Sequence, residues 1–269
     1  MVVPSARCSN LAREARPDES RGPASCGSID RVGVAQRVHS TAVVSSAAEV
    51  ADDVEIGPYA VVHAGVRLAP GVRIDAHAVI GGEPQDLSFT GGVTYLEVGR
   101  DTAIREGAVI HRATTSARPT RIGAKCLIMG QTHIGHDCWI GDGVVVSQQA
   151  GIAGHVTIGD GAVIGGMCGV HQHVRIGTQA MVAAMAKVNR DVLPFCAVDG
   201  NPATHRALNV VGLRRAGVAN ADYRALRSAF QRLRAGQELD DVGGLVDQLA
   251  QFLAEKSLRG IASFQREVA

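Results

Sequence analysis

Large aromatic side chains are scarce in this chain. Phenylalanine, tryptophan and tyrosine together make up 3% of its 269 residues, whereas glycine occurs 32 times. A close-packed interior built without large rings has to be filled by small aliphatic side chains. The composition therefore predicts a narrow core.

Excess charge of one sign and long apolar runs are also lacking. The formal net charge is +1 and the pI is about 7.7, which gives no reason to expect a nucleic acid or an anionic membrane surface as a partner. No run of eighteen apolar residues occurs, so we expect no transmembrane segment. The N-terminus lacks the charged start and apolar core of a secretion signal, so we expect a cytoplasmic protein.

The paired cysteine spacing of a zinc finger is absent as well. A chain of this length does not need a disulfide framework, so we expect reduced thiols. The six cysteines are residues 8, 26, 126, 138, 168 and 196.

The most prominent pattern is an aliphatic residue at every sixth position. This frame holds from 38 to 80, from 98 to 110 and from 122 to 188. A small or β-branched residue usually follows four positions later, and glycine often follows directly. A period of six matches neither a helix nor an ordinary strand.

A prismatic parallel β-helix explains the period of six. Each hexad supplies one short strand and one corner, and three hexads form one triangular coil. Coils stack at the inter-strand spacing of about 4.8 Å. The aliphatic residue points inward and the small residue fills the corner, so we expect Cys138 to be a core residue and not a metal ligand.

The frame is interrupted twice, and each interruption predicts a loop that leaves the prism. The first is GGEPQDLSFTGGVTYLE, residues 81–97, and the second lies near Ser116 in TTSARPTR, residues 114–121. Loops on a rigid scaffold are frequent locations of functional residues.

The chain divides into three parts by pattern. Residues 1–37 have no period and mixed charge, which predicts a disordered extension. Residues 38–190 predict the β-helix, and residues 191–269 predict a C-terminal helical subdomain.

Three segments of that subdomain are apolar with helical spacing. They are residues 219–236, 242–257 and 260–269. Asn220 or Asp222 is the expected N-cap of the first helix and Gly236 its stop.

Residues one coil apart, three hexads along the chain, should stack on one edge of the prism. Gly154 and then Gln172 follow His136 in one column, and His155 and then His173 follow Asp137 in the next. Several histidines clustered on one edge indicate a functional site more than an ordinary solvent-exposed surface. The polar seam, as we call this set, consists of His133, His136, Asp137, His155, His171, Gln172 and His173.

Three kinds of function remain open for the seam. Zinc needs three or four converging ligands, for which His133, His136 and His155 are candidates, as in a zinc-dependent hexapeptide-repeat hydratase. The spacing of a histidine pair five positions apart, found in hexapeptide-repeat carbonic anhydrases, is not present around His136. A non-catalytic scaffold is a further alternative.

A general base that works without a metal is the hypothesis we favour. Asp137 can orient the imidazole of His136 and raise its basicity. The N–H of Gly154, one coil above, could face an oxyanion in acyl transfer. Together they would suffice to move an acyl group to a hydroxyl.

Seven segments together resemble the acyl-carrier-protein:UDP-N-acetylglucosamine O-acyltransferases, which catalyse the first step of lipid A biosynthesis. The resemblance covers roughly residues 38–269, and HxxHDC, GMxxVHQ and GNPA are its most specific elements. The segments are QDLSF (85–89), IHRATT (110–115), HIGHDC (133–138), AGHVTIGD (153–160), IGGMCGVHQ (164–172), GNPATHRALN (200–209) and GLRRAG (212–217).

The resemblance implies a fold and partners. The fold is a left-handed parallel β-helix with a C-terminal α-helical subdomain, in a homotrimer with active sites between neighbouring prisms. The co-substrates are a 3-hydroxyacyl thioester on the phosphopantetheine of acyl carrier protein and a UDP-sugar. No metal and no separate cofactor is implied.

The resemblance also implies residue roles. His136 would be the general base for the glucosamine 3-hydroxyl, Asp137 its support, and the Gly154 N–H the oxyanion donor. The residues implied for substrate binding are Asp86 and Gln85 in the first loop, His133, His155, His171 and Gln172 on the seam, and Asn209 and Arg215 near the uridine diphosphate.

Some positions depart from the family pattern. Ser88, Val211 and Ala216 stand where lysine, glutamate and arginine are usual, which leaves room for a related amino sugar and an amide product. Ala184 occupies the acyl-length position, where glycine is common in enzymes that use long chains. One added methyl in the acyl groove would favour a shorter chain, because a buried methylene is worth about 0.8 kcal/mol.

Overall fold

The computed structural model describes residues 37–239 and 243–265, and all of these belong to one compact unit. The disordered extension predicted for residues 1–37 lies, except for Arg37, outside the described residues.

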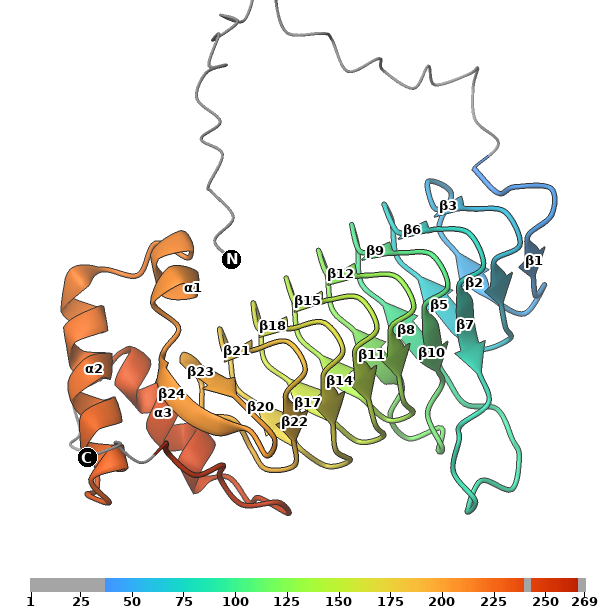
Figure 1. Cartoon of the computed structure of the whole chain (residues 1–269). Coiled ribbons are helices and arrows are strands. Elements are labelled where there is room, and N and C mark those ends of the chain that lie inside the picture. The colour runs from blue at the N-terminus through green and yellow to red at the C-terminus, as the bar shows by residue number, and fades with distance from the viewer. Residues whose placement is uncertain (1–36, 240–242, 266–269) are drawn as a thin grey trace, which may run out of the picture. The chain divides into compact units, whose positions relative to one another are not determined.

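Three sheets, parallel except for the last strand of the third, form the sides of a prism (Figure 1). Sheet 1 consists of β1 (Val43–Val44), β4 (Val61–Val62), β7 (Val79–Gly82), β10 (Val109–His111), β13 (His133–Ile134), β16 (Gly151–Ile152), β19 (Gly169–Val170) and β22 (Lys187–Val188). Sheet 2 consists of β2 (Glu49–Val50), β5 (Val66–Leu68), β8 (Leu96–Val98), β11 (Thr120–Ile122), β14 (Trp139–Ile140), β17 (Thr157–Ile158) and β20 (Arg175–Ile176). Sheet 3 consists of β3 (Glu55–Ile56), β6 (Arg73–Ile74), β9 (Ala103–Ile104), β12 (Leu127–Ile128), β15 (Val145–Val146), β18 (Val163–Ile164), β21 (Met181–Val182), β23 (Cys196–Asp199) and β24 (Thr204–Leu208).

The six-residue frame becomes the inner lining of the prism. Ile134 pairs with Ile152, which pairs with Val170, and all three are buried. Burying a side chain of this size stabilises the fold by about 1.5–3 kcal/mol. In the two-residue strands the first residue is more exposed than the second, so one sheet face is packed and the other is available for contacts.

The two predicted loops leave the prism and keep its aliphatic positions in phase, with a local register shift between Ile110 and His111. Val79 pairs with Val109, so the coil that contains β7 is two hexads longer than a regular coil of three. Val109 in turn pairs with His133, so the next coil is one hexad longer. Because both insertions are whole numbers of hexads, the aliphatic positions stay in phase.

Cys138 lies in the core, as predicted. It is fully buried, and its thiol donates to the carbonyl of Ala153 at 3.1 Å. Burial raises the pKa of this thiol to about 12. A buried neutral thiol of this kind is neither a nucleophile nor a metal ligand.

The C-terminal part begins on the prism and ends in helices. β23 continues sheet 3 and pairs antiparallel with β24. Then follow α1 (Val210–Arg215), α2 (Asn220–Arg234) and α3 (Leu245–Ala254). They enclose a second core that includes Phe195, Leu226 and Leu249.

The helix predictions are confirmed in part. Helices at 219–236 and 242–257 correspond to α2 and α3, and Gly236 follows α2 with a φ of 72°. Neither Asn220 nor Asp222 caps α2, because the N-cap is Ala219, with no side-chain hydrogen bond.

The helix expected over 260–269 is wrong for its described part. Ile261 and Phe264 are extended and bridge to Asp191 and His205. Their apolar side chains therefore pack from an extended segment. None of the helices in the described part of the chain is long and apolar enough to cross a bilayer.

Candidate functional site

Three stacked corners between sheets 1 and 2 carry the polar seam. His155 N donates to His136 O at 2.9 Å, and His173 N donates to Gly154 O at 3.2 Å. These bonds show that successive corners lie one above another, as the spacing of three hexads predicted. Asp137, His155 and His173 all have φ near +60°, so the same turn repeats at each level.

His136 and Asp137 form a hydrogen-bonded pair. Nδ1 of His136 lies 2.8 Å from Oδ2 of Asp137. A carboxylate only accepts, so Nδ1 donates, and in the neutral imidazole the lone pair therefore lies on Nε2. The His136 side chain is 10% exposed, which limits competition from water.

The second loop holds Asp137 in place. Thr114 donates to its carboxylate from the backbone N, at 3.1 and 3.2 Å, and from the hydroxyl, at 2.9 Å. The backbone N of Asp137 donates to the hydroxyl of Thr120 at 2.8 Å. Neither threonine was predicted as a site residue, because no period indicates how a loop closes over the prism.

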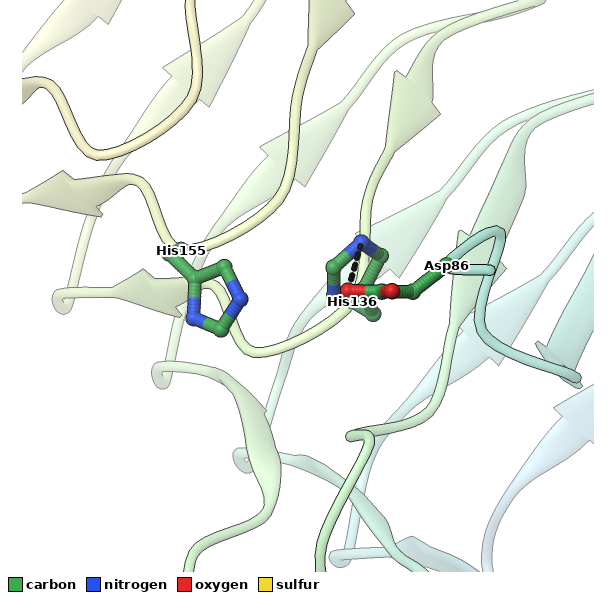
Figure 2. Close-up of side chains that lie close together, drawn as sticks. All are labelled: Asp86, His136 and His155. Carbon is green, nitrogen blue, oxygen red and sulfur yellow. Dashed lines mark ion pairs between the residues drawn. The ribbon is translucent and has the colours of Figure 1, made fainter. Parts of the chain in front are cut away.

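The first loop brings Asp86 to the other side of the imidazole. Its Oδ2 lies 4.0 Å from Nε2 of His136 (Figure 2). Asp86 accepts from the backbone N and the hydroxyl of Ser88, at 2.8 and 2.7 Å. These two bonds hold the pKa of the Asp86 carboxyl below its usual value, so it is ionised near neutral pH.

His155 completes the cluster from the next corner (Figure 2). Its ring meets that of His136 edge to face, with centroids 5.1 Å apart, and its Nε2 lies 3.7 Å from Oδ2 of Asp137. The His155 ring stacks on that of His173 at 4.6 Å. Burial, followed by the charge of His155, lowers the pKa of His173.

A metal ion could be held by Asp86, His136 and His155. Their ligand atoms lie within 4.8 Å of one another, and a histidine oriented by a carboxylate is a common metal ligand. The set predicted from the sequence contained His133 where the structure has Asp86.

His133 is paired with His111 instead. Their rings meet at an angle, with centroids 5.2 Å apart, and burial lowers the pKa of both imidazoles. Nδ1 of His111 donates to the carbonyl of Glu83 at 2.6 Å. The Nε2 atoms of both rings are buried without a hydrogen-bond partner among the described residues. His111 was not predicted as a site residue.

A groove lies beside the seam on the outer face of sheet 1. Gly151 and Gly169 expose bare backbone there, so the surface is lowered between His133 and Lys187. His171 and Gln172 form its edge.

Two bonds from the C-terminal segment hold that edge. Arg259 donates through Nε to the carbonyl of Gln172 at 2.8 Å, and its Nη2 lies 2.7 Å from Nδ1 of His171.

Gln85 is exposed in the same loop as Asp86. The other three predicted residues, Asn209, Arg215 and Ala184, lie away from His136 within the single chain. Asn209 is the N-cap of α1 and donates to the carbonyl of Gln179 at 2.8 Å, at the corner between sheets 2 and 3. Arg215 ends α1, and Ala184 is exposed at the corner between sheets 3 and 1.

Two protein-family models match this chain. The model for domain 2 of UDP-N-acetylglucosamine O-acyltransferase matches residues 191–267. The bacterial transferase hexapeptide model matches residues 47–82 and 119–154.

Curated relatives are named acyl-[acyl-carrier-protein]–UDP-N-acetylglucosamine O-acyltransferase. The relative from Akkermansia muciniphila is 44% identical over 220 residues, which cover 75% of this chain and 85% of the relative. The relative from Synechocystis sp. is 41% identical over 171 residues, 64% of this chain. The aligned part spans only 62% of that relative's own length.

Solved structures of UDP-N-acetylglucosamine acyltransferases have the same fold as this chain. The UDP-N-acetylglucosamine acyltransferase from Campylobacter jejuni is 31% identical with a TM-score of 0.69, covering 85% of this chain and 100% of that one. The enzyme from Francisella novicida is 28% identical with a TM-score of 0.71, covering 84% and 94%. The fold is the left-handed parallel β-helix. This chain therefore belongs to the acyl-[acyl-carrier-protein]–UDP-N-acetylglucosamine O-acyltransferase family.

Proposed function

We propose that this protein transfers a 3-hydroxyacyl chain from acyl carrier protein to the 3-hydroxyl of UDP-N-acetylglucosamine or a close sugar-nucleotide analogue. The observation that carries the proposal is the bond of 2.8 Å between His136 Nδ1 and Asp137 Oδ2. It selects the tautomer of a largely buried imidazole in which Nε2 carries the lone pair that a general base needs. The names of the relatives support the donor and the acceptor.

His136 acts as base and then as acid. As the sugar hydroxyl oxygen attacks the thioester carbonyl carbon, its proton passes to Nε2 of His136. The carbon–sulfur bond of the tetrahedral intermediate then breaks, and the departing sulfur takes that proton. Asp137 stabilises the imidazolium that exists between these two steps.

Gly154 is proposed to stabilise the oxyanion. Its N–H has no acceptor among residues 37–239 and 243–265. An unpaired backbone donor beside the base is suited to the negative oxygen that forms during attack. The absence of a side chain at this position lets the reacting carbonyl approach.

Sugar and carrier contacts are assigned around this centre. Asp86 and Gln85 would bind sugar hydroxyls from the first loop. The ionised Asp86 carboxylate, which accepts from Ser88, is a suitable acceptor for such hydroxyls. The seam residues proposed to line the donor and acceptor sites are His133, His155, His171 and Gln172.

Asn209 and Arg215 would bind the uridine diphosphate from a neighbouring copy. Within one chain Asn209 lies at a different corner of the prism from His136. A homotrimer would bring α1 of one copy to the seam of the next. Val43, exposed at the start of the outward-facing valine column of sheet 1, is apolar surface that such packing would cover.

The site is proposed to work without a metal ion or separate cofactor. The proposed location is the cytoplasm, where acyl carrier protein would supply the thioester. Cys126, Cys138, Cys168 and Cys196 are free thiols, which accords with a reducing compartment.

The acceptor sugar is the part of the proposal with an alternative. Val211 is 61% exposed on α1, and Ala216 is the C-cap of that helix. Neither offers a charge to the nucleotide, and Ser88 is committed to Asp86. A 3-amino sugar nucleotide, which would give an amide product, is therefore the second acceptor to test.

The experiment is a product assay with a series of hydroxyacyl carrier proteins and both acceptors, read by mass spectrometry. His136→Ala should keep the fold and lose acyl transfer by several orders of magnitude, whereas His77→Gln, an exposed corner histidine, should retain it. Ala184→Gly should lengthen the preferred chain. Full activity of purified His136→Ala would refute the base assignment.

A further inference from the structure

One short segment, residues 111–114, contacts the parts of the chain that hold both carboxylates beside His136. Its first three residues donate hydrogen bonds to the first loop, which carries Asp86. Its fourth residue donates to Asp137. The segment therefore lies where the positions of the two carboxylates can be set together.

A bulge at the end of β7 aims this segment at the first loop. The register between β7 and β10 shifts by one residue there, because His111 pairs with Gly82 and not with Gly81. Gly81 has a φ of 81°, and a β-carbon on it would lie 2.2 Å from Cγ2 of Val66. A larger residue would therefore disturb the bulge. Bulges of this kind redirect side chains beside functional sites.

Arg112 holds the two ends of the first loop together. Its Nη1 donates to the carbonyl of Gly81 at 3.1 Å, and its Nε donates to the hydroxyl of Thr94 at 3.1 Å. Its Nη2 lies 3.2 Å from a carboxylate oxygen of Glu83, which is mostly exposed, so this ion pair contributes little. The Arg112 side chain is 13% exposed. A planar guanidinium can hold acceptors on several sides at once, which a single ammonium group cannot.

The position of Asp86 depends on the path of this loop. Asp86 accepts from Ser88, but both residues belong to the loop, so their bonds do not tie it to the prism. Arg112 does tie it, and its guanidinium also lies 5.8 Å from the ring centroid of Phe89. A loosened loop would carry Asp86 away from Nε2 of His136, which now lies 4.0 Å from its Oδ2.

Thr114 has the corresponding relationship to Asp137. Its hydroxyl donates at 2.9 Å to Oδ2, the same oxygen that lies 2.8 Å from Nδ1 of His136. Its backbone N donates to both carboxylate oxygens, at 3.1 and 3.2 Å. These donors fix the direction from which the carboxylate meets the imidazole, and such orientation favours reaction.

We propose that Arg112 and Thr114 are positioning residues of the acyl-transfer site, Arg112 for the sugar-binding Asp86 and Thr114 for Asp137. This proposal rests on the proposed function and adds two residues that act through a carboxylate and not on the substrate itself. Because they act on different carboxylates, their variants should differ in kinetic effect. Loss of the Arg112 contacts weakens acceptor binding, whereas loss of the Thr114 hydroxyl slows the chemical step.

Arg112→Lys keeps the charge and loses the fork that spans Gly81 and Thr94. The KM for UDP-N-acetylglucosamine should rise about tenfold, while kcat and the KM for the acyl carrier protein stay near the wild-type values. Arg100→Lys, at a corner arginine whose side chain is 70% exposed, is the matched control and should behave like the wild type. An unchanged KM for the acceptor, or an equal rise of both KM values, would overturn the role of Arg112.

Thr114→Val should lower kcat about tenfold with both KM values unchanged, because one hydrogen bond to a charged group is lost and the backbone contacts remain. Thr114→Ser keeps the hydroxyl and should retain most of the activity. Thr115→Val, at the exposed neighbour in the same loop, is the matched control. Equal kcat values in Thr114→Val and Thr115→Val, or an equal loss in Thr114→Ser and Thr114→Val, would refute the role of Thr114.

Hydrogen exchange separates this proposal from the proposed function, because it needs no turnover. In the full-length protein the backbone N of Ser88 is bonded to Asp86 within the first loop. Peptides from residues 83–94 should exchange several-fold faster in Arg112→Lys than in the wild type and in Arg100→Lys, even if no acyl sugar forms. Equal exchange in all three proteins would show that Arg112 does not hold the loop.

Discussion

A β-carbon placed on Gly154 would lie 2.5 Å from Cε1 and 2.6 Å from Nε2 of His136. Real β-carbons do not approach other atoms so closely, so the imidazole occupies the space that any side chain at 154 would need. The proposed base and the proposed oxyanion donor are thus packed against each other, and any side chain at position 154 would displace the His136 ring.

Gly154→Ala should therefore displace the His136 ring and lower kcat by about 100-fold, a typical loss for a displaced general base. Its melting temperature should fall only slightly, since the ring can rotate toward the groove. Gly169→Ala, where nothing lies within 4 Å of an added β-carbon, is the stability control and should melt like the wild type. Wild-type turnover in Gly154→Ala would contradict the packing argument.

Asp137→Asn should lower kcat by about 10²–10⁴-fold with little change in KM. An amide no longer fixes the proton on Nδ1 of His136 and no longer stabilises the imidazolium. Steady-state kinetics with both substrates measures the effect. Asp142→Asn is the matched control, because Asp142 also accepts from a neighbouring coil, at Ala124 N, but lies at another corner. Equal kcat values in the two variants would remove Asp137 from the reaction.

The sequence predicts the prism because a six-residue aliphatic period has one efficient way to bury its side chains. Ile134 and Ile152 therefore lie in one inner column. His136 and Gly154, each two residues further along the chain, must then lie above one another in a neighbouring column. The approach of Asp86 to His136 and the contact of Thr114 with Asp137 could not be derived from the residues alone, because loops have no period that fixes their path.

The C-terminal part shows a second limit. Ile261 and Phe264 have helix-like spacing, yet both bridge to the body of the protein from an extended segment. Tertiary contacts with Asp191 and His205 decide the backbone there, and local propensity is a weak guide against them. Ala219 likewise precedes α2 without a capping side chain, although Asn220 and Asp222 are adjacent.

Added zinc should inhibit the proposed acyl transfer, whereas a chelator should leave it unchanged. The three ligand atoms of Asp86, His136 and His155 lie within 4.8 Å of one another, so a zinc ion bound there would occupy the lone pair of the base. His155→Gln should raise the inhibition constant of zinc by about tenfold or more. His77→Gln, an exposed corner histidine stacked on Tyr59, should leave it unchanged.

The opposite result would change the reaction class. Loss of activity on chelation, restored by stoichiometric zinc, would contradict the metal-free mechanism and favour a zinc-dependent hydratase. Inhibition that is equally strong in His155→Gln and in the wild type would place the inhibitory ion elsewhere.

The stability of the protein should fall between pH 7 and pH 5 because of His205. Burial lowers the pKa of this imidazole to about 4, against an ordinary value of 6.5. It accepts from Leu193 N at 2.9 Å and donates to the carbonyl of Ala262 at 3.0 Å, so it is held neutral. Between pH 6.5 and pH 4, His205 is protonated in the unfolded chain but stays neutral in the folded chain.

The stabilisation is therefore complete above pH 6.5 and is lost as the pH falls toward 4. The linkage amounts to roughly 2 kcal/mol between pH 7 and pH 5. Urea unfolding at the two pH values measures it. His205→Gln should be less stable at pH 7, since it loses the Leu193 or Ala262 contact, but its unfolding free energy should change less with pH. His111 and His133, whose pKa values are also lowered by burial, contribute a slope of the same sign in both proteins. An identical pH dependence in wild type and His205→Gln would show that the buried ring does not control acid sensitivity.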